Sequence, residues 1–462
     1  MRKDEIDMLH GNLWTGMLAF AVPLMLTNIL QLVFNAADMI VVGRFVGKES
    51  LAAVGSTTNI IFLLTNLFIG ISVGANVITA QYIGEGNTKS VNDSIRTAVT
   101  FSLAAGFGML VFGQIVTRPI LELLGSPPDV IDKSEIYLRA YVCGLPVMLL
   151  YNFAASQLRA FGDTKHPMYY LMISGLINVI LNVIFVVAFH LDTLGVGLAT
   201  VLSQCISAAL TLRQLKSMVP DSGLSLRKPG IHREILLKIL KVGIPAGLQN
   251  IMFSIANLTI QSSVNSFGSS VMAASTASSN VENITYLSMN SFQYANLSFV
   301  GQNYGAGNLR RVRKIMLVSV SLAVLFGLII GYVSIGLGPW VFRIYTNDEE
   351  VLQYALRKLW IINSLYFLSG IQDAFSGGIK GFGYSFVAMV NALIGVCLAR
   401  VIYIWTIFAA HRTFDVLFAV YPFSFAVSAV LQCVGFIVIY RRLLRQQAEK
   451  NEQDRATLKE TC

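Results

Sequence analysis

Charged residues are scarce in this chain. Only 13% of its 462 residues are Asp, Glu, Lys or Arg, whereas about a quarter is usual for a soluble domain. Hydrophobic residues make up 55%, and they gather in runs of about 20 or more, long enough to cross a bilayer as helices. The composition therefore excludes a soluble protein and predicts an integral membrane protein.

Several kinds of catalytic site are missing as well. The five cysteines and five histidines show no metal-ligand spacing, and no Ser/His or paired-carboxylate arrangement occurs. The glycine-rich segments lack the Lys-Ser/Thr of a phosphate-binding loop. We therefore expect a protein that is not an enzyme and that needs no cofactor.

The two halves of the chain repeat each other. AQYIGEGNTKSV (80–91) lies 221 positions before GQNYGAGNLRRV (301–312), and RAFG (159–162) precedes KGFG (380–383) by the same offset. The glycines of the longer pair are expected to allow a tight turn between spans. A membrane protein made of two like halves is typical of a secondary transporter.

The apolar runs predict an all-α integral membrane protein with twelve transmembrane helices in two pseudo-symmetric six-helix lobes. The predicted spans are 15–42, 52–79, 95–117, 135–157, 167–190, 195–215, 236–265, 272–299, 314–338, 352–376, 385–409 and 414–440. The predicted domains are an N-terminal lobe (1–215), a cytoplasmic linker (216–238), a C-terminal lobe (239–440) and a cytoplasmic tail (441–462).

Positive charge predicts the orientation in the membrane. With the N-terminus inside, the cytoplasmic segments hold 24 Lys and Arg residues and the opposite side holds eight, while Arg139 and Arg400 fall within spans. This asymmetry predicts a multi-pass protein with both termini in the cytoplasm. It also accounts for the net charge of +9 without a nucleic-acid partner.

One helical stripe in the first predicted span is polar. Asn28, Gln31, Asn35 and Asp38 are spaced by three, four and three positions, which places them on one face. Lipid cannot satisfy such groups, so the stripe must face other helices or a wet cavity. The amides either hold the bundle together or serve transport, whereas for the carboxylate we expect a function, because an ionised group at mid-bilayer costs ~2.5–3.5 kcal/mol or more.

Asn178 and Asn182 lie one turn apart on the fifth predicted span. Amide and hydroxyl oxygens together with one carboxylate suit a hard monovalent cation, and Asp38 alone would suit a proton relay. Hydrogen bonds between packed helices explain two asparagines equally well.

Three charged residues fall within predicted spans of the second half: Glu282, Asp373 and Arg400. Either they serve transport, or Arg400 forms a buried ion pair with Glu282 or Asp373 that fixes helix register. Together with Asp38 they give three acids against one base. This count predicts a net-negative interior, which favours cationic substrates or coupling ions.

The motifs resemble those of the multidrug and toxic compound extrusion (MATE) family. The resemblance rests on NAADMIVVGRFVG (35–47), on the following LAAVG (51–55), on the two Gln-x-x-Gly-x-Gly-Asn loops and on the RAFG and KGFG segments. It covers about residues 10–440. It implies twelve helices in two lobes and antiport of a drug-like, usually cationic compound against sodium or protons at the cell inner (plasma) membrane.

The resemblance also implies roles for particular residues. The family's span-one aspartate matches Asp38, and in one branch of the family Asn178 and Thr200 match site residues. That branch has an aspartate where this chain has Asn182. The resemblance thus implies that a proton binds at Asp38, or that Na+ binds at Asp38, Asn178 and Thr200, with Asn182 beside them. The candidates for the substrate cavity are Gln31, Asn35, Glu282, Asp373 and Arg400.

We therefore expect a monomer in the lipid bilayer that exports cationic or amphipathic small molecules in exchange for Na+ or H+. The alternative is a flippase for a lipid-linked or amphipathic metabolite. A lipid substrate would need a cationic pocket for its phosphate, and bases within the predicted spans are few.

Overall fold

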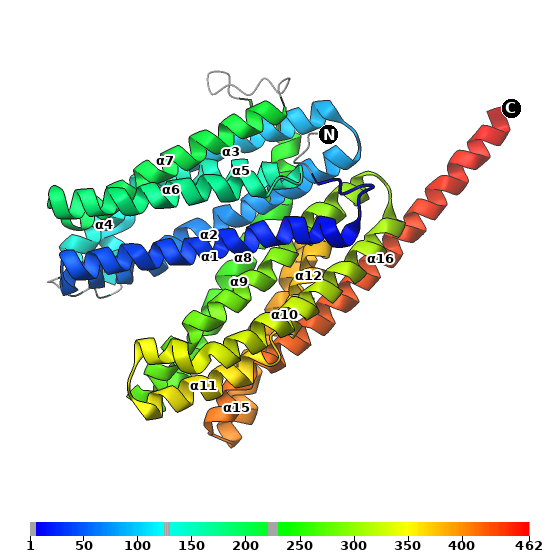
Figure 1. Ribbon diagram of the computed structural model, residues 1–462. Coiled ribbons are helices and arrows are strands. Elements are labelled where there is room, and N and C mark those ends of the chain that lie inside the picture. The colour runs from blue at the N-terminus through cyan, green and yellow to red at the C-terminus, as the bar shows by residue number, and fades with distance from the viewer. Residues whose placement is uncertain (1–5, 124, 126, 128–129, 220–229, 462) are drawn as a thin grey trace. The chain divides into compact units, whose positions relative to one another are not determined.

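The computed structural model describes residues 6–123, 125, 127, 130–219 and 230–461. These residues are almost entirely helical and form no strand, as Figure 1 shows. The predicted all-α class is thus confirmed. Because lipid offers no hydrogen bonds, a chain this apolar satisfies its backbone groups inside its own helices.

The chain divides into two compact units, Met1–Ile251 and Met252–Cys462. The first unit holds α1 (Leu13–Phe45), α2 (Lys48–Gly84), α3 (Thr88–Leu123), α4 (Ile131–Cys143), α5 (Leu145–Ala160), α6 (Lys165–Val183), the π-helical segment η1 (Ile184–Ala188), α7 (Asp192–Met218) and the start of α8 (Arg233–Asn265). The division falls inside α8. Residues 220–229 of the predicted linker lie outside the described residues, so the lobe boundary at 216–238 stays a prediction.

The second unit continues from α8. Its helices are α9 (Ser269–Gly305), α10 (Leu309–Tyr345), α11 (Glu349–Asn363), α12 (Phe367–Gly381), α13 (Ser385–Ala392), the π-helical η3 (Leu393–Leu398), α14 (Ala399–Tyr403), the π-helical η4 (Ile404–Phe408), α15 (Phe414–Phe418) and α16 (Val420–Thr461). The last helix extends through the predicted tail, as the red end of α16 shows (Figure 1).

Each predicted span falls on one helix or on one interrupted helix. By length and composition, nine helices of the described chain suit a membrane crossing, and α4 with α5 forms a tenth, bent by 47°. That bend follows from Gly144 and Pro146, since proline cannot donate the next backbone hydrogen bond. The remaining two predicted spans correspond to α9, which is rich in polar residues, and to α11 followed by α12.

The sequence repeat is also a repeat of structure. The bounds of α2 and α9 differ by 221 positions at both ends. Three pairs of glycines with positive φ share that offset: Gly47 and Gly268, Gly86 and Gly307, Gly162 and Gly383. Of these, Gly86 (φ 70°) and Gly307 (φ 69°) lie in the repeated loops and adopt the left-handed conformation that glycine allows. The predicted tight turns are thereby confirmed.

Close helix packing in the first unit depends on four glycines. Gly70 and Gly74 on α2 face Gly243 and Gly247 on α8, and each pair is separated by three residues. A Cβ atom at Gly247 would lie 2.6 Å from the carbonyl oxygen of Leu67, and one at Gly74 would lie 2.7 Å from the Gly243 nitrogen. The backbones approach too closely for any side chain, which is the packing mode of small-residue motifs in membranes.

Candidate functional site

Asp38 lies on α1 and joins a chain of hydrogen bonds that reaches α6 and α7. Asn182 Nδ2 donates to Asp38 Oδ1 at 2.5 Å and lies 3.3 Å from Asn178 Oδ1. Asn178 Nδ2 in turn donates to Thr200 Oγ1 at 3.5 Å. The four residues proposed from sequence for ion coupling therefore meet in one place, although they come from three helices.

Burial makes this cluster sensitive to charge. Asn182 is 0% exposed, Asn178 is buried and Asp38 is half-buried. The Asn182 side-chain oxygen is buried and accepts no hydrogen bond within the described residues. A buried acceptor without a donor lowers the stability of the fold. A cation or a proton bound at this position would satisfy the oxygen.

An apolar cluster adjoins these polar groups. Val41 and Val42 of α1 pack with Val186 of η1, Val196 of α7 and Tyr137 of α4. Such surroundings lower the local dielectric constant, so that an interaction between a cation and the Asp38 carboxylate is stronger than it would be in water. No pattern in the sequence indicates that Tyr137 lies here, because the contact joins helices that are far apart in the chain.

The rest of the polar stripe on α1 behaves differently. Gln31 and Asn35 are exposed and form no hydrogen bond within the described residues, and Asn28 is partly buried. Of the four stripe residues, only Asp38 belongs to the hydrogen-bonded chain. Gln31 and Asn35 remain candidates for contact with substrate.

In the second unit Glu282 on α9 is paired with Lys358 on α11. Lys358 Nζ lies 3.2 Å from Glu282 Oε1 and donates to the carbonyl oxygen of Ser275 at 3.0 Å and to Ser279 Oγ at 2.8 Å. Ser278 Oγ donates to the same carboxylate at 2.6 Å. The alternative of an ion pair between Glu282 and Arg400 is therefore wrong. Lys358 takes that place because it lies on the buried face of its helix.

Asp373 on α12 is also buried and also lies near a lysine. Gln293 Nε2 donates to its Oδ1 at 3.4 Å, while its Oδ2 accepts no hydrogen bond in the described chain. Lys380, two turns further along α12, is only 3% exposed and interacts electrostatically with Asp373. The alternative of an ion pair between Asp373 and Arg400 is thus wrong as well.

Arg400 on α14 lies between α8 and α16. It is 4% exposed, and it donates through Nε to Ser424 Oγ at 3.0 Å and through Nη1 to Asn257 Oδ1 at 2.7 Å. Its guanidinium carbon lies 4.7 Å from the ring centre of Tyr421 and 5.8 Å from that of Phe425. Within the described part of the chain it forms no ion pair. Glu282 is instead paired with Lys358 on α11.

These positions correct the predicted balance of charge. Lys358 and Lys380 were not counted among the charges within spans, yet both are buried in helices, so that the second unit holds two buried acids and three buried bases. The prediction of a net-negative interior is wrong for this unit. One signal was available for Lys358, because it continues the helical stripe of Val351, Ala355 and Ile362.

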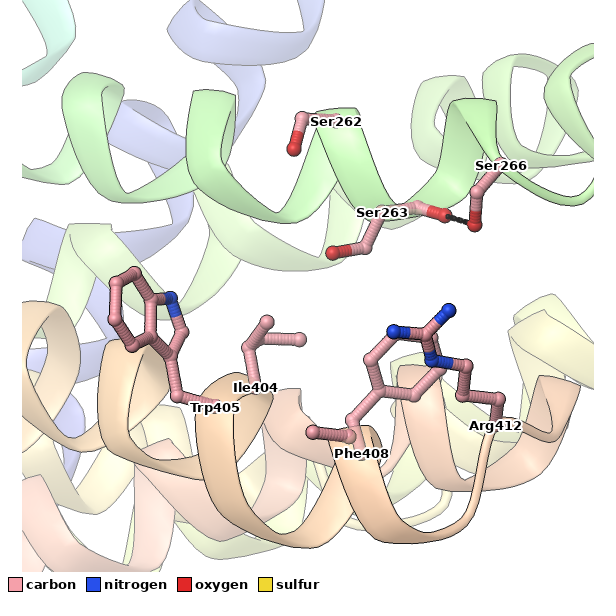
Figure 2. Close-up of a pocket in the computed structure, with 8 residues that line it drawn as sticks. Ser262, Ser263, Ser266, Ile404, Trp405, Phe408 and Arg412 are labelled. Carbon is pink, nitrogen blue, oxygen red and sulfur yellow. Dashed lines mark hydrogen bonds between the residues drawn. The ribbon is translucent and has the colours of Figure 1, made fainter.

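A groove of about 450 Å³ lies between α8 and the end of the η4 span. Figure 2 shows Ser262, Ser263 and Ser266 of α8 across the groove from Trp405, Phe408 and Arg412. Ile404 and Ala409 complete the lining. The groove has one hydroxyl-rich wall, one apolar wall and a cation at its end, which suits an amphipathic molecule.

No group of three His, Cys, Asp or Glu side chains in the described residues could hold a metal ion. A multivalent metal centre would require such a group. The oxygen set around Asp38 is of another kind, since one carboxylate with amide and hydroxyl oxygens fits a monovalent cation or a proton.

Comparison with known proteins supports the fold and the family. The chain is 29% identical over 430 residues to the probable multidrug resistance protein YoeA of Bacillus subtilis (strain 168). This match covers 91% of this chain and 92% of that protein. It is 23% identical over 389 residues to the FAD transporter of Shewanella oneidensis, covering 82% and 85%. A crystal structure of MATE in complex with MaL6 has a TM-score of 0.89 at 20% identity, covering 96% of this chain and 100% of that one.

The family model MatE matches the chain twice, at residues 23–184 and 245–406. The two matches begin 222 positions apart, in agreement with the repeat in the sequence and in the helices. They span most of both units, and the helical fold is that of solved MATE transporters. The chain is therefore a member of the MatE family of multidrug efflux transporters.

Proposed function

We propose that this transporter is an antiporter that exports cationic or amphipathic small molecules in exchange for Na+ or H+. The observation that carries the proposal is the hydrogen-bonded chain from Asp38 through Asn182 and Asn178 to Thr200. It holds a carboxylate among amide and hydroxyl oxygens, in surroundings where a cation or a proton would neutralise it. We further propose that the protein works as a monomer in the plasma membrane, with both termini in the cytoplasm.

The residues present fit a coupling ion. Asp38, Asn178, Asn182 and Thr200 offer one carboxylate, two amide oxygens and one hydroxyl, and a bound cation would supply the charge that neutralises Asp38. To contribute its oxygen, Asn182 would turn its amide and give up its hydrogen bond to Asp38. That bond joins α6 to α1. Occupancy of the site would thus change how the two helices hold each other, which is the differential interaction that a shift between two states requires.

The test is transport by Asp38→Asn in proteoliposomes. We expect this isosteric variant to insert and to bind substrate, yet to lose efflux driven by an imposed sodium or pH gradient. Asp132→Asn is the matched control, because Asp132 is exposed at the start of α4 and belongs to a surface ion-pair network with Arg118. Coupled efflux by Asp38→Asn at the rate of the control would contradict the proposal.

The choice of ion follows from the same assay. If a sodium gradient alone drives efflux at constant pH, the oxygen set acts as a sodium site. If only a pH gradient does so, Asp38 acts as a proton carrier.

A flippase for a lipid-linked or amphipathic metabolite is the second candidate. The observation in its favour is that Lys358, Lys380 and Arg400 are buried in the second unit, so that bases are not scarce there. One relative is an FAD transporter, which adds metabolites to the candidate substrates of this chain. Two of these bases already face acids, however, and only Arg400 is left without one. Scrambling of a fluorescent lipid in liposomes without any ion gradient would favour this candidate over the antiporter.

A further inference from the structure

Arg400 is a buried cation without an acid to neutralise it. It is 4% exposed, and no ion pair in the described residues includes it. A guanidinium held away from water is destabilising unless an anion or a full set of acceptors compensates its lost hydration. In a membrane protein such a residue is the first place to look for a ligand.

The hydrogen bonds of Arg400 leave some N–H donors of its guanidinium without an acceptor. Of its five N–H groups, Nε donates to Ser424 and one on Nη1 donates to Asn257. Nη2 donates to no described residue, and it is not fully buried. The side chain is therefore buried along its length, while Nη2 keeps some contact with solvent.

Neighbouring groups fix the direction of the guanidinium. Tyr421 and Phe425 lie against the guanidinium, and Ser424 between them holds Nε. On the other side Asn257 is itself exposed on α8. A planar fork held by stacked rings, with donors free, is the arrangement that binds carboxylate or phosphate oxygens in proteins.

Arg400 lies in the part of the second unit that corresponds to α6 of the first. The offset of 222 between the two family matches carries Asn178 onto Arg400, and the offset of 221 between the repeated glycines carries it onto the neighbouring Ala399. Asn178 and Asn182 on α6 join Thr200 on α7 to Asp38 on α1, and Arg400 on α14 joins Asn257 on α8 to Ser424 on α16. Each unit thus has a polar junction of three helices, one around an acid and the other around a base.

The residues that line the groove follow this junction along both helices. Ile404 lies one turn beyond Arg400 on the same span, and Ser262 lies five positions beyond Asn257 on α8. An anionic group at Arg400 would therefore leave the apolar body of the same molecule beside Ile404 and Trp405 (Figure 2).

We propose that Arg400 and Asn257 form an anion-recognition subsite for the carboxylate or phosphate of an amphipathic compound that the transporter exports. The groove between α8 and η4 holds the apolar part of that compound. The proposal rests on the exporter function and specifies its substrate class: amphipathic molecules that carry an anionic group are preferred to matched compounds without one.

The test is equilibrium binding of two dyes to the purified, detergent-solubilised protein, followed by fluorescence polarisation. Rhodamine B has a free carboxylate, and its ethyl ester has the same ring system without that charge. We expect the wild type to bind rhodamine B more tightly. Arg400→Gln should weaken rhodamine B binding at least about tenfold, the scale of one charge-assisted hydrogen bond, and leave the ester within about twofold. Arg343→Gln removes an exposed cation of the same unit and should change neither.

A second variant guards against misfolding of Arg400→Gln. Asn257→Asp would put a carboxylate where the Asn257 oxygen now lies, 2.7 Å from Arg400 Nη1. This internal anion should occupy the subsite, so we expect a higher melting temperature together with loss of the preference for rhodamine B. An unchanged preference in a folded Asn257→Asp protein would overturn the proposal. Equal losses of affinity for rhodamine B and for its ester in Arg400→Gln would overturn it as well.

Lipid is the other source of an anionic group. If phosphatidylglycerol displaces rhodamine B from the wild type and not from Arg400→Gln, while phosphatidylcholine does neither, the occupant is a lipid headgroup and the exported-substrate proposal fails. Because binding is measured without any gradient, Asp38→Asn should keep the preference for rhodamine B. Failure of ion coupling and failure of the anion subsite are therefore told apart.

Discussion

Lys358 Nζ lies 3.2 Å from Glu282 Oε1 in the interior of the second unit, and the lysine is only 1% exposed. Serine groups from α9 satisfy both partners, with Ser275 and Ser279 accepting from the lysine and Ser278 donating to the glutamate. The pair fastens α11 to α9. It also removes Glu282 from the charges that are free to attract a cationic substrate.

Breaking this pair should destabilise the protein strongly. Lys358→Met and Glu282→Gln each leave one buried charge without its partner, and we expect each to lower the free energy of unfolding by about 3–5 kcal/mol. The double variant should lose less free energy of unfolding than the two single variants lose together, because neither buried charge remains. Denaturant unfolding in detergent, arranged as a double-mutant cycle, measures this coupling.

Arg357→Met is the matched control for that cycle. Arg357 is the neighbour of Lys358, but its pair with Asp415 is about half exposed on both sides, so we expect a change below about 1 kcal/mol. Equal effects of Lys358→Met and Arg357→Met would show that the buried pair contributes no more than a surface pair.

A second carboxylate beside Asp38 should tighten cation binding. In Asn182→Asp the new acid would replace the amide that now donates to Asp38. Two carboxylates in contact repel each other, and either a cation or a proton relieves the repulsion. We therefore expect the Na+ or H+ concentration for half-maximal efflux to fall in proteoliposome assays. Asn178 also contacts Asn182, but Asn178→Ala adds no charge and should raise that concentration instead.

The close glycine contact between α2 and α8 predicts that two glycine-to-alanine substitutions affect the melting temperature differently. A Cβ atom at Gly70 would collide with the backbone of Gly247, whereas one at Gly108 on α3 would meet open space. We expect Gly70→Ala to lower the melting temperature and Gly108→Ala to leave it unchanged or raise it, since alanine favours a helix by up to ~1 kcal/mol over glycine. A thermal shift assay in detergent compares the two. Equal shifts would show that the close approach is not needed.

The helices and their repeat could be predicted from sequence because they depend on local features. Apolar length sets where a helix crosses the bilayer, and glycine in the left-handed conformation sets where Gly86 and Gly307 turn the chain. Asp38 was identifiable for a related reason: a carboxylate in an apolar run needs a function or a partner, whatever its neighbours are.

The partners of the other charges could not be predicted in this way. Lys358 and Lys380 lie near the ends of apolar runs, and sequence cannot tell a loop lysine from one that turns inward. The close contact of Gly70 with Gly247 was missed for the same reason, since it joins segments far apart in the chain.

The sequence by itself determined that this protein is a helical membrane transporter of two like halves with an acid in its first span, because chain length, hydropathy and local turn chemistry are properties of short segments. Only the tertiary structure decided that Asp38 meets Asn182, that Glu282 pairs with Lys358 and that Arg400 is left without an acid. Those relations depend on which faces of distant helices pack together, and side-chain hydrogen bonds act over about 3 Å.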